Sequence, residues 1–450
     1  MGCGCSLGAE TLVPTEGLFF QNFKLGKKLG EGAFGQVRLT TRISTGATYA
    51  VKIMDVRRSG DDKSLDVHIL REARSESQLL GEVSGHPHVV ALYETYLETP
   101  GLFYMIMQRC FGSLMDSLCD MPKLAECKLR RMFRQMLSGI GACHDARIVH
   151  RDIKLDNFLY GGEDQETIKL SDFGLAAKIP SSGYLKGVSG TAPYMSPEML
   201  AKKSYSTQTD VWSFASTVYV ILYGDVPYSP SQPSPAAVKK AIATAHPPPR
   251  WMRSAKLAKR YDQPCSGAEN FCRFLLVREP SQRPTVHAAL MHSFVEDCIP
   301  EKVREESPVL IETAGEQVRT IAEMFKLEKP RIISRRLDEV LARLENAGPP
   351  LPHGDISEVA GGHCFSEELP QYSSGEGEDK ITFATSLRRK GSEKRIVVHQ
   401  RCHSAEMGFG RGDRRAHTHS GVTEENWEDL LPHILPGAPE ERSPRHQTLK

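Results

Sequence analysis

The feature that most constrains this chain is the stretch from residue 148 to residue 174, IVHRDIKLDNFLYGGEDQETIKLSDFG. It combines two carboxylates, Asp152 and Asp172, with the cation of Lys154 and the amide of Asn157. Their spacing allows a short hairpin to bring the four side chains together. Phosphoryl transfer requires such a set, because its catalysis consists mostly of positioning and charge neutralisation. The stretch therefore predicts a site that handles a phosphoryl group.

Each of these side chains has a chemical role available to it. Asp152 can accept the hydrogen bond of an attacking hydroxyl, and Lys154 can lie beside the transferred group. Asn157 and Asp172 can supply oxygen ligands to Mg²⁺, a hard cation held by few protein groups together with phosphates. Any one of these residues alone could equally belong to a surface turn. The complete pattern H-R-D-x-K-x-x-N followed by D-F-G favours the catalytic interpretation.

A glycine pattern lies near the start of the chain. Gly30, Gly32 and Gly35 form G-x-G-x-x-G, which dinucleotide-binding folds also carry. Those folds need a helix directly after the glycines. Here residues 36–41, QVRLTT, alternate with period two and are rich in β-branched side chains, so they predict a strand. A strand–turn–strand hairpin can fold over ATP phosphates with its bare backbone N–H groups.

The next predicted strand, residues 47–56, carries Lys52. Ala50 and Lys52 share one face of it, and the odd-numbered residues share the other. Ala50 can present a small side chain to adenine, while Lys52 reaches the phosphates; a solvated edge lysine is the ordinary alternative. Lys52 then needs an anionic partner from the predicted helix 65–83. Glu76 is favoured by its position, with Glu72, one turn away, as the alternative.

Length and composition restrict the function further. A chain of 450 residues is long enough for more than one domain, and 40% hydrophobic with 25% charged residues fits a globular protein with disordered parts. A net charge of +1 argues against nucleic acid as a partner. Eleven cysteines at irregular spacing, without a secretory signal, favour free thiols in a reducing cytosol. No apolar run approaches the roughly 20 residues needed to span a bilayer.

The N-terminal segment, residues 1–22, begins with a lipidation pattern. Met1 to Ser6 fits M-G-x-x-x-[ST], which predicts N-myristoylation at Gly2. One myristoyl chain binds membranes only marginally, and Cys3 and Cys5 are placed for palmitoylation as a second anchor. An unmodified terminus is the alternative. The expectation is a protein tethered to the cytoplasmic face of a membrane, and otherwise cytoplasmic.

With these motifs in hand, residues 23–294 resemble a eukaryotic protein kinase of the serine/threonine type, loosely similar to the calcium/calmodulin-dependent group. The resemblance implies an α+β, two-lobed kinase fold: a small antiparallel sheet lobe and a larger helical lobe, with ATP and Mg²⁺ between them. It implies phosphorylation of protein hydroxyls, with Lys52, Asp152 and Lys154 catalytic and Asn157 and Asp172 on the metal. The nucleotide-binding residues that it implies are Leu29, Gly30, Gly32, Phe34, Gly35, Val37, Ala50, Lys52, Glu76, Gln108 and Cys110.

The resemblance also implies structural roles. Met107 would gate the back of the nucleotide pocket, Glu198 would pair with Arg283, and Asp210 would cap backbone N–H groups of the catalytic loop. One departure concerns regulation, because Gly187 occupies the position that is usually phosphorylated. Arg151 could still pair with a phosphate at another site of the loop 175–197. A kinase-shaped scaffold without activity is the main alternative, although the residues that scaffolds usually lose are all present.

Two segments follow the kinase-like region. Residues 301–346 are charged and helix-prone, and within them residues 329–344, KPRIISRRLDEVLARL, form a basic amphipathic pattern. This pattern fits a helix packed on the kinase domain, or alternatively a calmodulin target or membrane-surface segment. Residues 347–450 are rich in Gly, Pro, Ser and His and lack sustained periodicity, which predicts a disordered tail.

Overall fold

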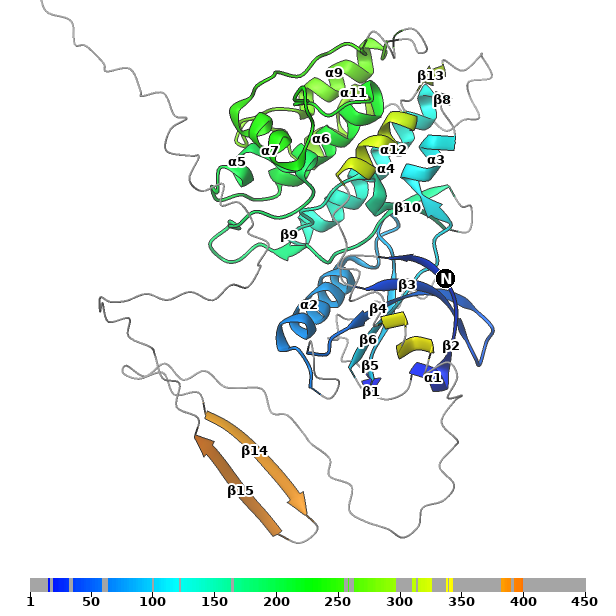
Figure 1. Ribbon diagram of the computed structural model, residues 1–450, viewed down its shortest axis with the longest axis vertical. Helices are drawn as coiled ribbons and strands as arrows, with labels where there is room; N and C mark the ends of the chain where they lie inside the picture. Colours follow the sequence, from blue (N-terminus) through cyan, green and yellow to red (C-terminus); the bar gives the residue numbers. More distant parts are fainter. Residues whose placement is uncertain are drawn as a thin grey trace, which may run out of the picture. The chain divides into compact units, whose positions relative to one another are not determined.

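The computed structural model describes fifteen stretches of the chain (Figure 1), which fall into two units, residues 1–352 and 353–450. The described residues are 15–16, 19–31, 35–58, 64–98, 101–120, 123–162, 166–254, 258, 263–296, 310–312, 315–325, 337–338, 340–342, 382–389 and 392–399.

The smaller lobe of the first unit is built on a six-stranded sheet with the order β1-β5-β6-β4-β3-β2. All neighbouring strands pair antiparallel except β1, which pairs parallel with β5. The predicted small antiparallel lobe is therefore confirmed, with one short parallel edge strand added. Its elements are β1 (Thr15–Glu16), α1 (Phe19–Asn22), β2 (Phe23–Glu31), β3 (Gln36–Arg42), β4 (Thr48–Asp55), α2 (Val67–Val83), β5 (Leu92–Glu98) and β6 (Leu102–Met107).

The two faces of β4 serve different purposes, as the alternation in its sequence predicts. Val51 and Ile53 are fully buried in a cluster with aromatic side chains of α1, β2, β5 and β6. Ala50 and Lys52 point the other way and line the cavity between the lobes. The sheet therefore presents the lysine to the cavity while an apolar core stabilises its opposite face.

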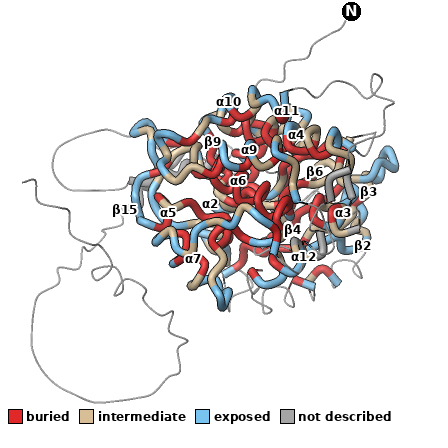
Figure 2. The backbone as a smooth tube through the Cα atoms, turned by 90° about the horizontal axis from the view of Figure 1, so that it is seen from above, coloured by how far each residue is buried: buried red, intermediate tan, exposed pale blue. Residues whose placement is uncertain are grey.

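The larger lobe is helical and centred on α6, a helix with buried residues along its whole length (Figure 2). The predicted helical stripe of α4 is also buried, with Leu129, Phe133 and Leu137 at 0% exposure. The helices are α3 (Leu114–Asp120), α4 (Glu126–Asp145), α5 (Pro197–Leu200), α6 (Gln208–Tyr223), α7 (Pro235–Thr244), α9 (Ser266–Leu275), α10 (Val286–Leu290) and α11 (Ser293–Glu296). The short elements are β7 (Gly112–Ser113), β8 (Lys123–Ala125), β9 (Ile148–Val149), η1 (Leu155–Asn157), β10 (Phe158–Gly161), β11 (Thr167–Leu170), β12 (Ala177–Lys178) and η2 (Ala192–Tyr194).

The segment that follows the large lobe contacts both lobes. It contains the strand β13 (Leu310–Glu312), which pairs antiparallel with β8, so the prediction of a helix-prone segment does not hold for these three residues. The helix α12 (Gly315–Met324) packs on α3. Residues 337–338 and 340–342 are helical, and Leu337 and Leu341 are buried against the small lobe. None of the described helices is both long and apolar enough to span a membrane.

In the second unit the structure describes two strands, β14 (Thr382–Arg389) and β15 (Ser392–His399), paired antiparallel. The prediction of disorder for residues 347–450 therefore does not hold for this pair. Valines and an isoleucine in the second strand have high strand propensity, and only Lys390 and Gly391 separate the two strands in the sequence.

Candidate active site

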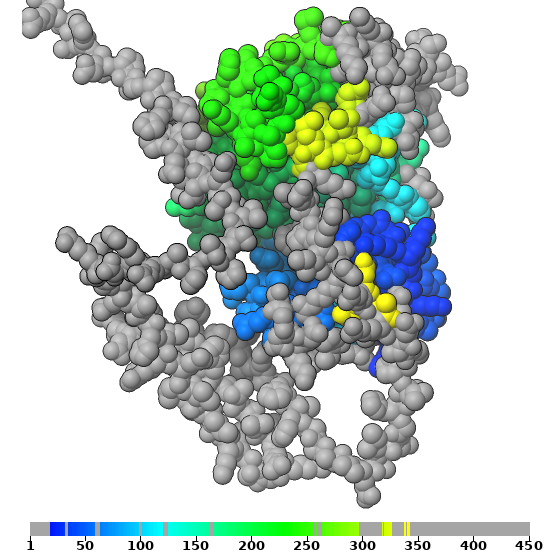
Figure 3. Space-filling model, in the orientation of Figure 1, coloured from blue at the N-terminus to red at the C-terminus, as the bar shows by residue number. Residues whose placement is uncertain are grey.

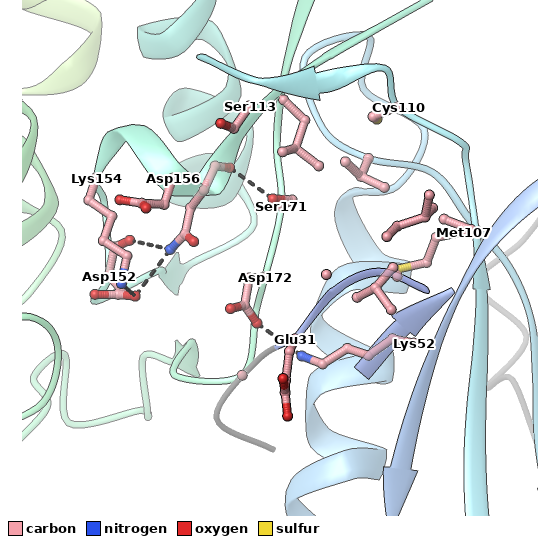
Figure 4. Close-up of a pocket in the computed structure, with 18 of the residues that line it drawn as sticks. Glu31, Lys52, Met107, Cys110, Ser113, Asp152, Lys154, Asp156, Ser171 and Asp172 are labelled. Atoms are coloured by element: carbon pink, nitrogen blue, oxygen red, sulfur yellow. Dashed lines mark hydrogen bonds and ion pairs between the residues drawn. The ribbon is translucent and has the colours of Figure 1, made fainter. Parts of the chain in front are cut away.

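Lys52 on β4 links two acidic residues from different elements. Its ammonium lies 2.6 Å from Oε1 of Glu76 on α2. It also lies 2.9 Å from Oδ1 of Asp172, which precedes Phe173 and Gly174 (Figure 4). Of the two glutamates that the sequence offered, Glu76 is thus the partner, while Glu72 is exposed. Lys52 and Glu76 are almost fully buried, so the ion pair fixes α2 against the sheet.

The electrostatics of this cluster favour the charged forms of Lys52 and Asp172. Burial alone would lower the pKa of Lys52, but the carboxylates of Asp172 and Glu76 outweigh it and raise that pKa. The Lys52 ammonium lowers the pKa of Asp172 to about 2. Burial raises the pKa of Glu76 although Lys52 opposes the change. Asp172 is therefore a carboxylate at neutral pH.

The catalytic-loop residues form a second cluster around the Asp152 carboxylate. The Lys154 ammonium lies 2.7 Å from Oδ2 of Asp152 and donates a hydrogen bond of 2.9 Å to the Thr191 hydroxyl. Thr191 in turn donates to Oδ1 of Asp152 at 2.7 Å. The Asn157 amide donates to the Asp152 backbone oxygen at 2.7 Å and to Oδ2 at 3.1 Å. These contacts hold the carboxylate in one orientation.

Buried Asp210, near the start of α6, forms hydrogen bonds with the backbone of the catalytic loop, which begins directly after β9. Its carboxylate accepts hydrogen bonds from the backbone N–H groups of His150 and Arg151, at 2.8 and 2.9 Å, as predicted. The ring of His144 adds a contact of 3.0 Å that the sequence did not indicate. Burial alone would raise the pKa of Asp210, but these partners, His144 above all, lower it overall. The cap supports the left-handed backbone of Arg151 (φ 66°).

A buried arginine–carboxylate clamp joins α5 to the end of the large lobe. The Arg283 guanidinium forms two parallel hydrogen bonds with Glu198, at 2.8 and 3.0 Å. The same guanidinium donates to the backbone oxygens of Val277, Gln208 and Arg278. The predicted Glu198–Arg283 pair is therefore present. Its contacts join parts of the large lobe to one another, so its role is structural.

Both clusters face a single cavity of about 700 Å³, a size that suits a nucleotide with room for an acceptor group. The predicted nucleotide-binding residues that line it are Leu29, Gly30, Val37, Ala50, Lys52, Glu76, Gln108 and Cys110, and the predicted catalytic and metal residues Asp152, Lys154, Asn157 and Asp172 line it as well. Met107, the predicted gate, also lies in the wall. The roles assigned to these residues remain predictions.

Gly35 does not line the cavity, and its part in nucleotide binding remains a prediction. A Cβ atom there would lie 2.1 Å from the Ile53 carbonyl oxygen, so the close approach to β4 explains the glycine. Gly32 and Phe34 lie outside the described residues. So do the predicted lipidation residues Gly2, Cys3 and Cys5.

Several cavity-lining residues were not predicted from the sequence. Ser113 and Asp116, joined by a hydrogen bond of 2.6 Å, line the end of the cavity beside α3. Ala322 and Phe325 line it from the C-terminal segment. The sequence feature that could have indicated Ala322 and Phe325 is the apolar helical spacing of residues 318–325, VRTIAEMF. Such spacing is typical of an amphipathic helix, but it does not specify the surface on which the helix packs.

The oxygen donors at the base of the cavity fit Mg²⁺. Asn157 uses its amide nitrogen for Asp152, so its carbonyl oxygen can serve as a ligand, and Asp172 adds a carboxylate that is 48% exposed to the cavity. Among the described residues no cluster of three or more His, Cys, Asp or Glu side chains could hold a metal. Two protein ligands suit Mg²⁺, because phosphates and water complete its coordination.

Comparison with known proteins identifies the family. The family model described as "Protein kinase domain" matches residues 23–295, which is more than half of the chain, so the chain belongs to the protein kinase family. It is 32% identical over 283 residues to "Hormonally up-regulated neu tumor-associated kinase" of Mus musculus, covering 61% of this chain and 37% of the relative. It is 34% identical over 210 residues to "Serine/threonine protein kinase OSK3" of Oryza sativa subsp. japonica, covering 46% and 40%. The resemblance to serine/threonine kinases inferred from the sequence is confirmed.

Proposed function

We propose that this chain is an ATP- and Mg²⁺-dependent serine/threonine protein kinase that transfers the γ-phosphoryl group of ATP to protein hydroxyls. The observation that carries the proposal is the convergence of two clusters on one cavity: Lys52 with Glu76 and Asp172, and Asp152 with Lys154. The first is a phosphate-binding arrangement with a metal ligand. The second is an oriented carboxylate beside a cation.

The residues would divide the work as follows. Lys52, held by Glu76, binds the non-transferred phosphates. Asp152 accepts a hydrogen bond from the substrate hydroxyl and orients its oxygen toward the γ-phosphorus, and it takes the proton as the O–P bond forms and the bond to ADP breaks. Lys154 offsets charge on the transferred group. Mg²⁺, held by Asn157 and Asp172, would neutralise phosphate charge.

The proposed preference for serine and threonine hydroxyls rests on less specific observations than the proposed phosphoryl transfer. Lys154 follows Asp152 by two residues and contacts Thr191, an arrangement similar to that of serine/threonine kinases. Relatives that match the kinase region carry serine/threonine kinase in their printed names. Because the match covers 37% of the first relatives, their substrates and partners do not transfer to this chain.

Substitution of Asp152 tests the proposal. Asp152→Asn should lower the rate of phosphate transfer to a serine- and threonine-containing peptide library by about 10²–10⁴-fold, because the proton acceptor is lost. Asp145→Asn is the matched control, since that carboxylate is 65% exposed and pairs with His287 on the surface. Equal transfer by wild type and Asp152→Asn would instead favour the kinase-shaped scaffold.

Attachment to a membrane is a second part of the proposal and rests on the sequence alone. A protein translated from Met1 would present Gly2 to acylation, with Cys3 and Cys5 as sites for a second chain. Gly2→Ala should then move the protein from the membrane to the soluble fraction of fractionated cells. An unchanged distribution, or no myristate label on the wild type, would refute the anchor.

Calmodulin binding by residues 329–344 is the alternative use of that segment. It would require Leu337 and Leu341 to leave the small lobe, where both are buried. Calcium-dependent capture of the chain on immobilised calmodulin would support this role. Its absence would favour the packed segment.

A further inference from the structure

Two side chains in the wall of the nucleotide cavity come from beyond the matched kinase domain. Ala322 on α12 and Phe325 directly after it line the cavity together with residues of both lobes, whereas the kinase match ends at residue 295. The backbone N–H of Phe325 donates to the Ile321 carbonyl oxygen at 3.1 Å, so Phe325 continues the last turn of α12. Its position is therefore fixed by the helix.

The large lobe holds α12 in this position. Ile321 and Phe325 are 8% and 6% exposed and belong to the main hydrophobic core. The helix packs on α3, and Arg319 lies 4.0 Å from Asp116 of that helix. Asp116 itself lines the cavity, so α12 adds to the wall at the end where α3 begins.

The same segment is anchored a second time on the small lobe. Leu337 and Leu341 are 1% and 0% exposed, in a cluster with aromatic residues of α1, β2, β5 and β6. Asp338 accepts a hydrogen bond of 3.0 Å from Gln36 of β3. Figure 3 shows the two contact regions as separate yellow patches, one beside the large lobe and one on the small lobe.

Phe325 forms part of the cavity wall and does not block the nucleotide site. The Lys52–Glu76 and Lys52–Asp172 contacts are made while Phe325 is in place, and a cavity of about 700 Å³ is left. An apolar ring at this position adds contact surface for a nucleoside, while the lysine cluster receives the phosphates.

We propose that Phe325 is a nucleotide-binding residue supplied by the C-terminal segment, and that Leu337 and Leu341 are positioning residues that hold this segment across both lobes. The inference rests on the proposed use of ATP and adds to it a residue that lies outside the kinase domain. ATP affinity then depends on the anchoring of residues 337–341 on the small lobe.

The first experiment measures binding of ATP with Mg²⁺ by calorimetry, using the whole 450-residue chain. Phe325→Ala should raise the Kd for ATP, and the KM for ATP, by about tenfold, with kcat and the KM for the peptide nearly unchanged. Met324→Ala is the matched control, because this neighbouring side chain is 44% exposed and does not line the cavity. Thermal melting without nucleotide verifies that each variant is folded.

The second experiment tests the anchor. The double variant Leu337→Asp/Leu341→Asp should raise the Kd for ATP as Phe325→Ala does, and adding Phe325→Ala to it should cause little further loss. Ala342→Asp, a change at an exposed neighbour, should leave the Kd unchanged. If the effects of the double variant and of Phe325→Ala on the free energy of ATP binding are fully additive, the two contact regions are not coupled and this part of the inference is overturned.

The outcomes separate this inference from the proposed function. If wild type binds ATP and Phe325→Ala binds it equally well, or more tightly, Phe325 is not a favourable nucleotide contact and the inference fails alone. If Asp152→Asn transfers phosphate as wild type does, the kinase assignment fails, while the comparison of ATP affinities still decides the role of Phe325.

Discussion

Thr191 donates a hydrogen bond of 2.7 Å to Oδ1 of Asp152, although 39 residues separate the two in the chain. The Lys154 ammonium contacts both partners. We predict that Thr191→Val, which removes the hydroxyl at similar volume, lowers kcat roughly 10- to 100-fold because the carboxylate loses an orienting contact. The KM for ATP should change little, since Lys52 binds the phosphates independently of this contact.

Thr191→Ser is the control for that prediction. It keeps the hydroxyl and should retain most of the wild-type kcat. A Thr191→Val variant with wild-type kcat would mean that the hydrogen bond does not orient the catalytic carboxylate.

Breaking the clamp between Arg283 and Glu198 should lower the stability of the folded protein. Glu198→Gln leaves a buried guanidinium without its counter-ion, and we expect it to lower the free energy of unfolding by about 3–5 kcal/mol. Arg283→Met should cost at least as much, because it also removes the donor to three backbone oxygens. Thermal melting of the variants measures the loss.

An exposed ion pair provides the comparison. Glu269 pairs with Arg273 on the surface of α9, and Glu269→Gln should change the free energy of unfolding by no more than about 0.5 kcal/mol. If Glu198→Gln melts as this control does, the buried clamp contributes no more than a surface pair.

The loop 175–197, the activation segment, is held in place by neutral partners of Arg151. Its guanidinium donates to the carbonyl oxygens of Leu175 and Ala176, at 2.5 and 3.5 Å, and contacts the hydroxyl of Tyr205 at 3.4 Å. Gly187 cannot carry a phosphate. We therefore predict kinase activity without phosphorylation of this segment.

Phosphatase-treated protein tests this expectation and should keep most of the untreated activity. An ion pair between Lys178 and Glu82 also connects the segment to α2 without a phosphate. A more than tenfold fall on phosphatase treatment would contradict the prediction. The same loss should then appear in a variant with alanine or phenylalanine at the candidate phosphate acceptors Ser181, Ser182, Tyr184 and Ser189.

The sequence predicted which side chains lie together most directly where the residues are close along the chain. Asp152, Lys154 and Asn157 lie within six positions, so their spacing nearly determines their arrangement. Glu76 was chosen over Glu72 by position, and burial explains the outcome, because an unpaired carboxylate is stable only on the exposed face of α2.

Long-range contacts were harder to predict. The residues of α12 were predicted only as part of a charged, helix-prone segment, and periodicity alone does not specify which surface covers the apolar face of a helix. Leu337 and Leu341 were predicted on an apolar stripe that packs on the kinase domain, and both are buried there, but the pattern did not specify the small lobe as the surface. The bond from Thr191 to Asp152 depends on the path of the whole activation segment, which no local pattern encodes.

The histidines of the connection between α2 and β5 predict a dependence of stability on pH. Burial lowers the pKa of His88, and the nearby Lys169 ammonium lowers it further, although the ring contacts the Ile168 carbonyl oxygen at 2.9 Å. Burial lowers the pKa of His86 as well, with charge on His88 and Lys169 adding to the effect and Asp145 opposing it. The folded protein therefore disfavours protonation of both rings.

The unfolded chain consequently binds more protons than the folded protein near and below pH 6.5, the ordinary pKa of histidine, so stability falls as pH is lowered through this range. His88→Asn should make the fall from pH 7.5 to pH 5.5 shallower, by at most about 1.4 kcal/mol per pH unit for one proton. His68→Asn, at an exposed position on α2, should keep the wild-type slope. Urea unfolding at several pH values gives these slopes, and an unchanged slope in His88→Asn would exclude His88 as the source of the dependence.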